Sequence, residues 1–286
     1  MAQRHHAAPV NTLEVASSRA ARRPIDRPAQ TAPARLETLW ARHLDEVRAA
    51  QKLRWQVFVD EMGARLTTPP GIAPGHDVDL FDDHCEHLLV RAWPADGSAP
   101  QVVGTYRVMT PTAARLIGGF YTETEFDLTR LRGQRQRMAE LGRSCVAAEW
   151  RNGGVILALW GALAAFMQRY GLDTVVGCAS VPMRDGGHYA ASLWTQLAAT
   201  HLAPLDVQVR PRLPLPVQEL RCDLRVEPPA LIKGYLKCGG KLLGPPAWDP
   251  DFQTADLPMM LRLDEMSPAY RRRLMNTAMN TAMNAA

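Results

Sequence analysis

The chain has 286 residues, of which 47% are hydrophobic and 22% are charged, so it is long enough for one large hydrophobic core and short for two full domains. Its formal net charge of +4 is too small to indicate a nucleic-acid partner, and no nucleic-acid-binding motif is present. The five cysteines are odd in number and never in C-x-x-C spacing, which argues against a disulfide framework or zinc ribbon and for a reducing cytoplasm.

No stretch has the character of a signal peptide or a transmembrane helix. The N-terminus is basic but lacks the apolar core of a signal peptide. The longest apolar run, at 155–167, is shorter than the roughly 20 residues that a helix needs to cross a bilayer. We therefore expect a cytoplasmic protein whose only membrane contact would be peripheral.

The two ends of the chain differ from its middle. Residues 1–34 are rich in Ala, Pro, Arg and Ser without an apolar period, which predicts a disordered basic arm. Residues 271–286 contain the repeat "MNTAMNTAMNAA" and are expected to form a low-complexity tail. One domain, at 35–270, is expected between them.

Hydrophobic periodicity alternates between helix and strand within this domain. In chain order, the expected elements are an amphipathic helix at 35–57, a loop at 66–76, strands at 87–93 and 102–109, a mixed segment at 111–137, a strand at 138–147, a helix at 154–169, a strand at 174–181, a helix at 188–201, a Pro-rich connection at 204–228 with a strand at 219–225, a helix at 229–238 and a strand at 257–263. An antiparallel first half followed by a β-α-β second half predicts an α/β (α+β) protein with a mixed central sheet flanked by helices.

The junction between the strand expected at 138–147 and the helix expected at 154–169 combines charged residues with two glycines. A helix that begins at Gly153 and Gly154 leaves its first N–H groups unpaired. The helix dipole adds partial positive charge there, and glycines allow close approach. Because Arg151 and Asn152 supply further donors, these four residues are a candidate seat for one phosphate. An ordinary tight turn is the alternative.

Glu140 and Arg143 interrupt the apolar strand before this joint. Strict alternation would place them on opposite faces. A β-bulge near Gly142 would change that relation and free backbone N–H groups, which can polarise a carbonyl oxygen as an oxyanion hole does. The helix that follows is apolar on every face, which predicts burial on all sides.

A segment at 75–89 crowds carboxylates with His76, His84, Cys85 and His87. Such side chains can bind zinc or iron. Their spacing fits no closed ligand set, so no metal is expected. A solvated acidic loop before a strand is the plainer interpretation.

In this order, the motifs resemble the GNAT acyltransferase superfamily. More specifically, they resemble the ornithine-lipid N-acyltransferases, which acylate the α-amino group of ornithine from 3-hydroxyacyl-acyl carrier protein. The matching stretches are "RWQVFVDEMG" (54–63), "DLFDDHCEHLLV" (79–90), "VVGTYRVM" (102–109), "ELGRSCV" (140–146), "RNGGVILALWGAL" (151–163), "GCASV" (177–181) and "YLKCGGKLLGPPAWDPDFQTADLPMML" (235–261).

The same framework is similar to the acyl-homoserine-lactone synthases, which share the arginines and acidic residues of these motifs. That family's tryptophan after the first helix is missing between 59 and 78, and nothing specifies S-adenosylmethionine. Lactone synthesis is therefore an alternative, as are acylation of another amine and a non-catalytic module that binds carrier protein or lipid.

The resemblance implies a GNAT-like N-acyltransferase that makes lyso-ornithine lipid. It implies no cofactor, because the phosphopantetheine thioester of acyl carrier protein is a co-substrate. Ile156 stands where coenzyme A-binding members carry a small residue, which favours a carrier arm with one phosphodiester. The implied partners are acyl carrier protein, ornithine and, because the product is amphiphilic, the anionic inner membrane. Carrier proteins are acidic, so a basic docking face is expected at Arg130, Arg132, Arg135 and Arg137, or at Arg151.

The resemblance also assigns candidate site residues. The substrate-binding set is Arg54, Phe58, Glu61, Asp79, Asp82 and Arg107. The catalytic set is Glu140, Arg143, Cys145 and Val146, and the phosphopantetheine-binding set is Arg151, Asn152, Gly153 and Gly154. Glu140 is the candidate base, because acylation needs a neutral amine, and the N–H groups of 143–146 are candidate oxyanion donors. Structural salt bridges among the charged residues are the alternative. Cys145 and Cys178 lie in apolar strands and are expected to be core residues rather than nucleophiles.

Overall fold

A computed structural model describes residues 35–274, so the predicted N-terminal arm and most of the predicted tail lie outside the described residues. The strands are β1 (Arg35–Trp40), β2 (Glu86–Trp93), β3 (Gln101–Met109), β4 (Phe126–Asp127), β5 (Met138–Val146), β6 (Thr174–Pro182), β7 (Arg210–Pro211), β8 (Lys241–Leu242), β9 (Ala247–Asp249) and β10 (Thr254–Arg262). The helices are α1 (Leu44–Trp55), α2 (Pro111–Ile117), α3 (Thr122–Glu125), α4 (Gly154–Arg169), α5 (His188–His201) and α6 (Ala230–Lys237).

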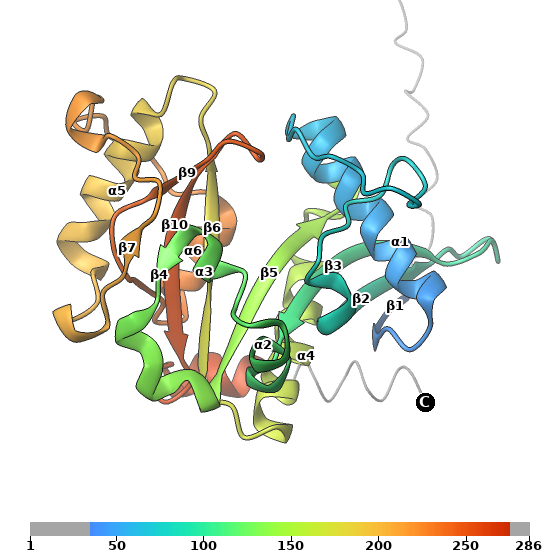
Figure 1. Ribbon diagram of the computed structural model, residues 1–286. Helices are drawn as coiled ribbons and strands as arrows, with labels where there is room; N and C mark the ends of the chain where they lie inside the picture. The colour runs from blue at the N-terminus through green and yellow to red at the C-terminus, as the bar shows by residue number, and fades with distance from the viewer. Residues whose placement is uncertain (1–34, 275–286) are drawn as a thin grey trace, which may run out of the picture. The chain divides into compact units, whose positions relative to one another are not determined.

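One mixed sheet organises these elements (Figure 1). Its strand order is β1-β2-β3-β5-β6-β10-β8, and β9 pairs with β10. The first four strands are antiparallel, and β10 is antiparallel to β6. β5 and β6 are parallel and joined through α4. The predicted α+β class with a mixed central sheet is therefore confirmed.

α1 and α4 cover opposite faces of β3 (Figure 1). Neighbouring residues of a strand point to opposite faces. Arg107 accordingly reaches Asp82, which also binds Arg54 of α1, whereas Tyr106 reaches Trp160 of α4. Among the described residues, no helix combines the length and hydrophobicity that crossing a bilayer requires.

The single helix predicted at 35–57 is wrong in its first part. Residues 35–40 form β1 at the edge of the sheet, and α1 begins only after His43, where His43 and Glu46 form a capping box. Leu36 and Trp40 both pack against the core. A spacing of four residues suits one face of a strand as well as one face of a helix, which explains the error.

The strand predicted at 219–225 is also absent. This segment runs along α5, and side chains of that helix satisfy its backbone. Ser192 donates to the carbonyl of Arg221 and accepts from the N–H of Leu224, and Gln196 bonds both backbone groups of Val226. Helix side chains therefore replace the ladder partner that a strand would need.

α4 begins and ends where the sequence predicted, but it is not buried on every side. Val155, Leu159 and Leu163 form its buried face, whereas Ile156 and Trp160 on the other face are half-buried. At the other end of the chain, residues 268–274 are helical, and Leu274 is buried in one cluster with Cys238 and Met266. The packed domain therefore extends past the predicted boundary at 270.

β5 and β6 diverge after a short parallel ladder. Only residues 138–140 of β5 pair with β6, where their partners are residues 174–176. The next residue of β6 is Gly177, where a Cβ would lie 2.4 Å from the carbonyl oxygen of Leu141. Only glycine allows this approach, so Gly177 permits the two strands to diverge at this point.

The predicted bulge near Gly142 is confirmed. β3 pairs Thr105 with Cys145 and Arg107 with Gly142, which leaves an extra residue of β5 opposite Tyr106. Arg143, inside the bulge, has a φ of 51°, in the left-handed region that non-glycine residues rarely adopt.

Candidate active site

The divergence of β5 and β6 opens a polar cavity of about 420 Å³, which we call the reaction cavity. Seven of the candidate site residues line it, namely Phe58, Glu61, Arg107, Glu140, Arg143, Val146 and Arg151. The remaining wall comes from several elements, including β3, β5, β6, β9, β10 and the segment of α6. The structure therefore brings residues of all three predicted sets to one cavity.

Arg54 and Arg107 form a buried ion-pair network with three aspartates. Arg54 lies 2.8 Å from Asp77 and 2.7 Å from Asp82, and Arg107 lies 2.6 Å from Asp79 and 3.1 Å from Asp82. Burial opposes ionisation of Asp82, but the guanidinium groups of Arg54 and Arg107 outweigh it and hold the pKa of that carboxyl well below its usual range. The substrate-binding role of these residues stays a prediction, because their charges already pair with one another.

Arg143 completes this network from the bulge. Its guanidinium lies 3.1 Å from Asp77 and 2.9 Å from Asp79. The rings of Tyr121 and Phe252 flank it, with centroids 4.8 Å and 4.6 Å away. Three arginines and three aspartates thus balance each other's charge on one side of the reaction cavity. Sequence reasoning did not assign a role to Asp77, Tyr121 or Phe252, and no local pattern marks them.

Glu140 lines the reaction cavity, but donors from α3 already occupy its carboxylate. The N–H of Tyr121 donates to one oxygen at 2.8 Å, and the N–H and hydroxyl of Thr122 donate to the other. Burial raises the pKa of Glu140, and these hydrogen bonds oppose the rise. The role of general base stays a prediction, and the carboxylate has a second role as an anchor for α3.

The thiols are poor nucleophiles. Burial raises the pKa of Cys145 to about 12 and the pKa of Cys178 well above its usual value. The thiolate is the reactive form of cysteine. The raised pKa values agree with the expectation that Cys145 and Cys178 are core residues rather than nucleophiles.

The candidate phosphate seat lies at the rim of the reaction cavity. Gly153 is left-handed, with φ of 95°, and the side chain of Asn152 accepts from the N–H of Gly154 at 3.1 Å. Arg151 donates to the carbonyl of Val146 at 2.9 Å and pairs with Glu61 at 2.6 Å. One helix N–H is thus already occupied, while those of the next two residues lack partners within the helix.

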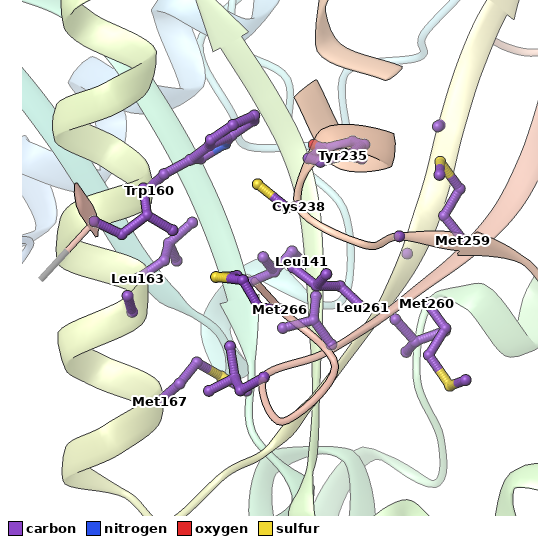
Figure 2. A pocket seen from close by; sticks show the side chains of 18 of the residues that line it. Leu141, Trp160, Leu163, Met167, Tyr235, Cys238, Met259, Met260, Leu261 and Met266 are labelled. Carbon is purple, nitrogen blue, oxygen red and sulfur yellow. The ribbon is translucent and has the colours of Figure 1, made fainter. Parts of the chain in front are cut away.

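A second cavity, of about 90 Å³, lies beside the first and is walled by apolar side chains (Figure 2). We call it the apolar cavity. Trp160, Leu163 and Met167 of α4 face Met259 and Met260 of β10 across it. Leu141, Cys178, Ala179 and Tyr235 line both cavities. The point where the strands diverge therefore lies between a polar chamber and an apolar one.

Two tyrosines mark this boundary. The hydroxyl groups of Tyr106 and Tyr235 hydrogen-bond each other, and Trp160 Nε1 lies 3.4 Å from Tyr106 Oη. Gly234, next to Tyr235, is needed here because a Cβ would lie 2.3 Å from the Trp160 ring. The polar ends of these rings satisfy one another, so the boundary presents apolar surface to the apolar cavity.

A further part of the reaction cavity wall is acidic. Asp249 and Asp256 line it, and Glu125 lies against Asp256. Burial, followed by the neighbouring carboxylates, raises the pKa of Glu125 to about 9 and that of Asp256 to about 6. Sequence reasoning missed these residues because Glu125 is far in sequence from Asp249 and Asp256, and only the fold brings them together.

Three of the four aspartates in the crowded segment at 75–89, Asp77, Asp79 and Asp82, join the ion network. His87 Nε2 lies 3.0 Å from the carbonyl oxygen of Asp82. Within residues 35–274, one group of three potential metal ligands occurs, and it is Glu125, Cys178 and Asp256. The plainer interpretation of a solvated acidic loop is wrong for Asp77 and Asp82, which are buried.

Comparison with known proteins agrees with this geometry. Residues 53–161 match the family model described as an acetyltransferase (GNAT) domain. Proteins named L-ornithine N(alpha)-acyltransferase from Agrobacterium fabrum and Rhodobacter capsulatus are 34% and 35% identical over 82% and 84% of this chain, and over 83% and 95% of their own lengths. The chain belongs to the L-ornithine N(alpha)-acyltransferase family. It is therefore an acyltransferase.

A solved structure supports the fold of this family member. The CoA-dependent acyl-homoserine lactone synthase BjaI with MTA matches with a TM-score of 0.50 at 16% identity, covering 87% of this chain and 90% of that chain. At this identity the likeness concerns the fold alone. It agrees with the predicted GNAT-like sheet, and the choice of substrates depends on the site.

Proposed function

We propose that this L-ornithine N(alpha)-acyltransferase family member moves a 3-hydroxyacyl chain from acyl carrier protein to the α-amino group of ornithine, giving lyso-ornithine lipid. The junction of the two cavities carries this proposal. A polar chamber with both charge signs meets an apolar chamber at the bulge of β5. A long-chain thioester and a zwitterionic amine require such a pair of environments side by side.

The donor would lie along the diverging strands. Beyond Glu140, the ladder between β5 and β6 ends, so the N–H groups on that edge of β5 have no partner strand. An oxygen of the thioester carbonyl can accept from them as charge develops on it. The acyl chain then enters the apolar cavity, where four methionines, Met167, Met259, Met260 and Met266, adapt their rotamers to widen it.

The reaction would be a direct aminolysis. The neutral α-amine attacks the thioester carbon, the new C–N bond forms, and the C–S bond breaks. Glu140 accepts the amine proton directly or through water, and the departing carrier thiolate takes up a proton. No acyl-enzyme forms, which agrees with the raised pKa values of Cys145 and Cys178.

The carrier protein would dock at the mouth of the reaction cavity, near Arg151. This side chain lines the cavity and is half exposed. Arg184 is exposed nearby, and its guanidinium lies 3.5 Å from the carbonyl oxygen of Glu61. The alternative basic face, 129–137, precedes β5 and so lies at the end of that strand away from the bulge. We further propose that the amphiphilic product leaves at a peripheral contact with an anionic membrane.

Purified full-length protein tests this proposal when it is incubated with 3-hydroxyacyl carrier protein and a panel of amino acids, with amide products identified by mass spectrometry. We expect an N-acyl product with ornithine and a much lower rate with the matching coenzyme A thioester. No amide with any acceptor would overturn the proposal. A product that requires S-adenosylmethionine would instead identify a lactone synthase.

A further inference from the structure

The acidic wall of the reaction cavity carries negative charge that the ion network does not balance. Glu125, Asp256 and Cys178 each place one polar atom so that all three lie within 4.8 Å of one another. Among residues 35–274, no lysine or arginine forms a salt bridge with Glu125, Asp249 or Asp256. The ion network itself is neutral as a whole, because its three arginines and three aspartates pair with one another.

Glu125 is the least satisfied of these acids. Asp256 accepts from the hydroxyl of Thr254 at 2.8 Å, and Asp249 accepts from two N–H groups in the turn that follows it. Both carboxylate oxygens of Glu125 are buried, and no residue of 35–274 makes a hydrogen bond of ordinary geometry with them. A buried polar group without a partner costs stability, so a ligand that donates to Glu125 would relieve this cost.

The spacing suits a primary ammonium group. The carboxylate oxygens of Glu125 and Asp256, at most 4.8 Å apart, can both lie about 2.8 Å from one point, which is the usual length of a charge-assisted N–H···O bond. An ammonium group has three donors, so it can bond both oxygens and still direct one N–H elsewhere. A carboxylate would be repelled from the same place.

We propose that Glu125 and Asp256, assisted by Asp249, bind the side-chain ammonium of a diamino-acid acceptor and so select it over monoamino acids. The inference rests on the proposed function, because it concerns the acceptor of that reaction. Holding the distal amine against the end of α3 and β10 leaves the α-amine free to face the bulge of β5. The acidic wall would thus choose both the acceptor and which of its two amines reacts.

The protonation of Glu125 in the free protein agrees with this role. Burial keeps Glu125 protonated at neutral pH in the free protein, since its pKa is raised to about 9. An arriving ammonium would displace that proton and leave a pair of opposite charges in a buried site. Asp256, whose pKa is raised only to about 6, keeps its charge at neutral pH, so the site presents negative charge to the arriving cation.

The test compares ornithine with norvaline, which has the same chain without the second amine. We expect Glu125→Gln and Asp256→Asn each to lower kcat/KM for ornithine about 10- to 100-fold, the effect of losing a charge-assisted hydrogen bond. The value for norvaline should change far less, so that the preference for ornithine collapses. Asp127→Asn, an exposed acid on the same short strand as Phe126, is the matched control, and thermal melts check that each variant folds.

The outcomes separate this inference from the proposed function. Equal losses with both acceptors would overturn it, as would an unchanged preference for ornithine. Loss of wild-type activity on treatment with a chelator would identify a metal in the same place and also overturn it. If the wild type forms no amide at all, the proposed function fails. If it acylates ornithine and norvaline equally well, that function stands and only this inference fails.

Discussion

The guanidinium group of Arg143 lies 3.1 Å from the Asp77 carboxylate while the rings of Tyr121 and Phe252 flank it. The residue holds this position with a φ of 51°, in a region that costs a non-glycine residue about 1–2 kcal/mol. Ion pairing and cation–π contacts offset that cost. The side chain of Arg143 therefore stabilises the bulge, whose residues line the reaction cavity.

Replacing Arg143 by lysine should disturb the bulge. Arg143→Lys keeps the charge but loses the fork that bonds two aspartates and the planar group that stacks on two rings. We expect the free energy of unfolding to fall by about 1–3 kcal/mol and kcat to fall at least 10-fold. Urea unfolding and steady-state kinetics measure both, with the exposed Arg48→Lys as control. A kcat within twofold of wild type would contradict a role for the bulge in the reaction.

Glu140 can act as the base, as the anchor of α3, or as both. Glu140→Gln removes the base, which typically contributes a factor of about 10² to 10⁴, so we expect kcat to fall by about 10² or more. Thr122→Val removes one hydrogen bond to the same carboxylate and should cost much less. The acidic limb of the pH profile of kcat/KM should disappear only in Glu140→Gln. Equal losses in the two variants would show that Glu140 acts as an anchor.

Charge reversal tests the docking of the carrier protein. Arg151→Glu places a negative charge beside Glu61 at the mouth of the cavity, so it should repel an acidic carrier. We expect KM for the carrier-bound donor to rise about 10-fold or more at low salt and the difference to shrink at high salt. Arg130→Glu, on the segment at the other end of β5, is the control. Unchanged turnover with carrier-bound donor in Arg151→Glu would rule out docking there.

The apolar cavity should limit the length of the acyl chain. Ala164 lines it from α4, whereas its neighbour Ala165 does not. Ala164→Phe should shift the kcat/KM optimum toward shorter donors, because the added ring takes up space that the end of the chain would occupy. Ala165→Phe is the matched control on the same helix. An unchanged profile over a series of chain lengths would place the acyl chain elsewhere.

The stability of the protein should depend on the protonation of Glu125. Its pKa is raised to about 9, first by burial and then by Asp256 and Asp249, against about 4.3 in the unfolded chain. The folded state therefore holds a proton that the unfolded state releases between these values. The stability from that proton is complete below a pH of about 4.3 and is lost as the pH rises toward about 9.

Glu125→Gln cannot ionise, so it should lose less stability over that range. We expect the drop in unfolding free energy between about pH 6 and about pH 9 to be smaller than in the wild type by about 1 kcal/mol or more. Urea midpoints at a series of pH values measure it, with Asp127→Asn for comparison. Parallel curves for wild type and Glu125→Gln would contradict the buried, protonated carboxyl.

Local signals predicted the centre of the fold well. The strand at 138–146, the helix that starts at Gly154 and the bulge near Gly142 follow from apolar runs, a glycine pair and two charges close together in sequence. The helix predicted at 35–57 failed because Leu36 and Trp40 fit both periods, and only the neighbouring strand β2 decides between them. The strand predicted at 219–225 failed because α5 supplied its backbone partners.

By itself, the sequence determined the order of the elements, the glycine joint at the helix start and the motifs that mark the family, because these depend on neighbours along the chain. Only the tertiary structure decided which charges meet. It bonds Glu140 to Tyr121 and Thr122, pairs Arg143 with Asp77, and leaves Glu125 against Asp256 without a hydrogen bond of ordinary geometry from residues 35–274. The pairing and burial of charged side chains depend on which strands lie side by side. Residue spacing along the chain does not predict that arrangement.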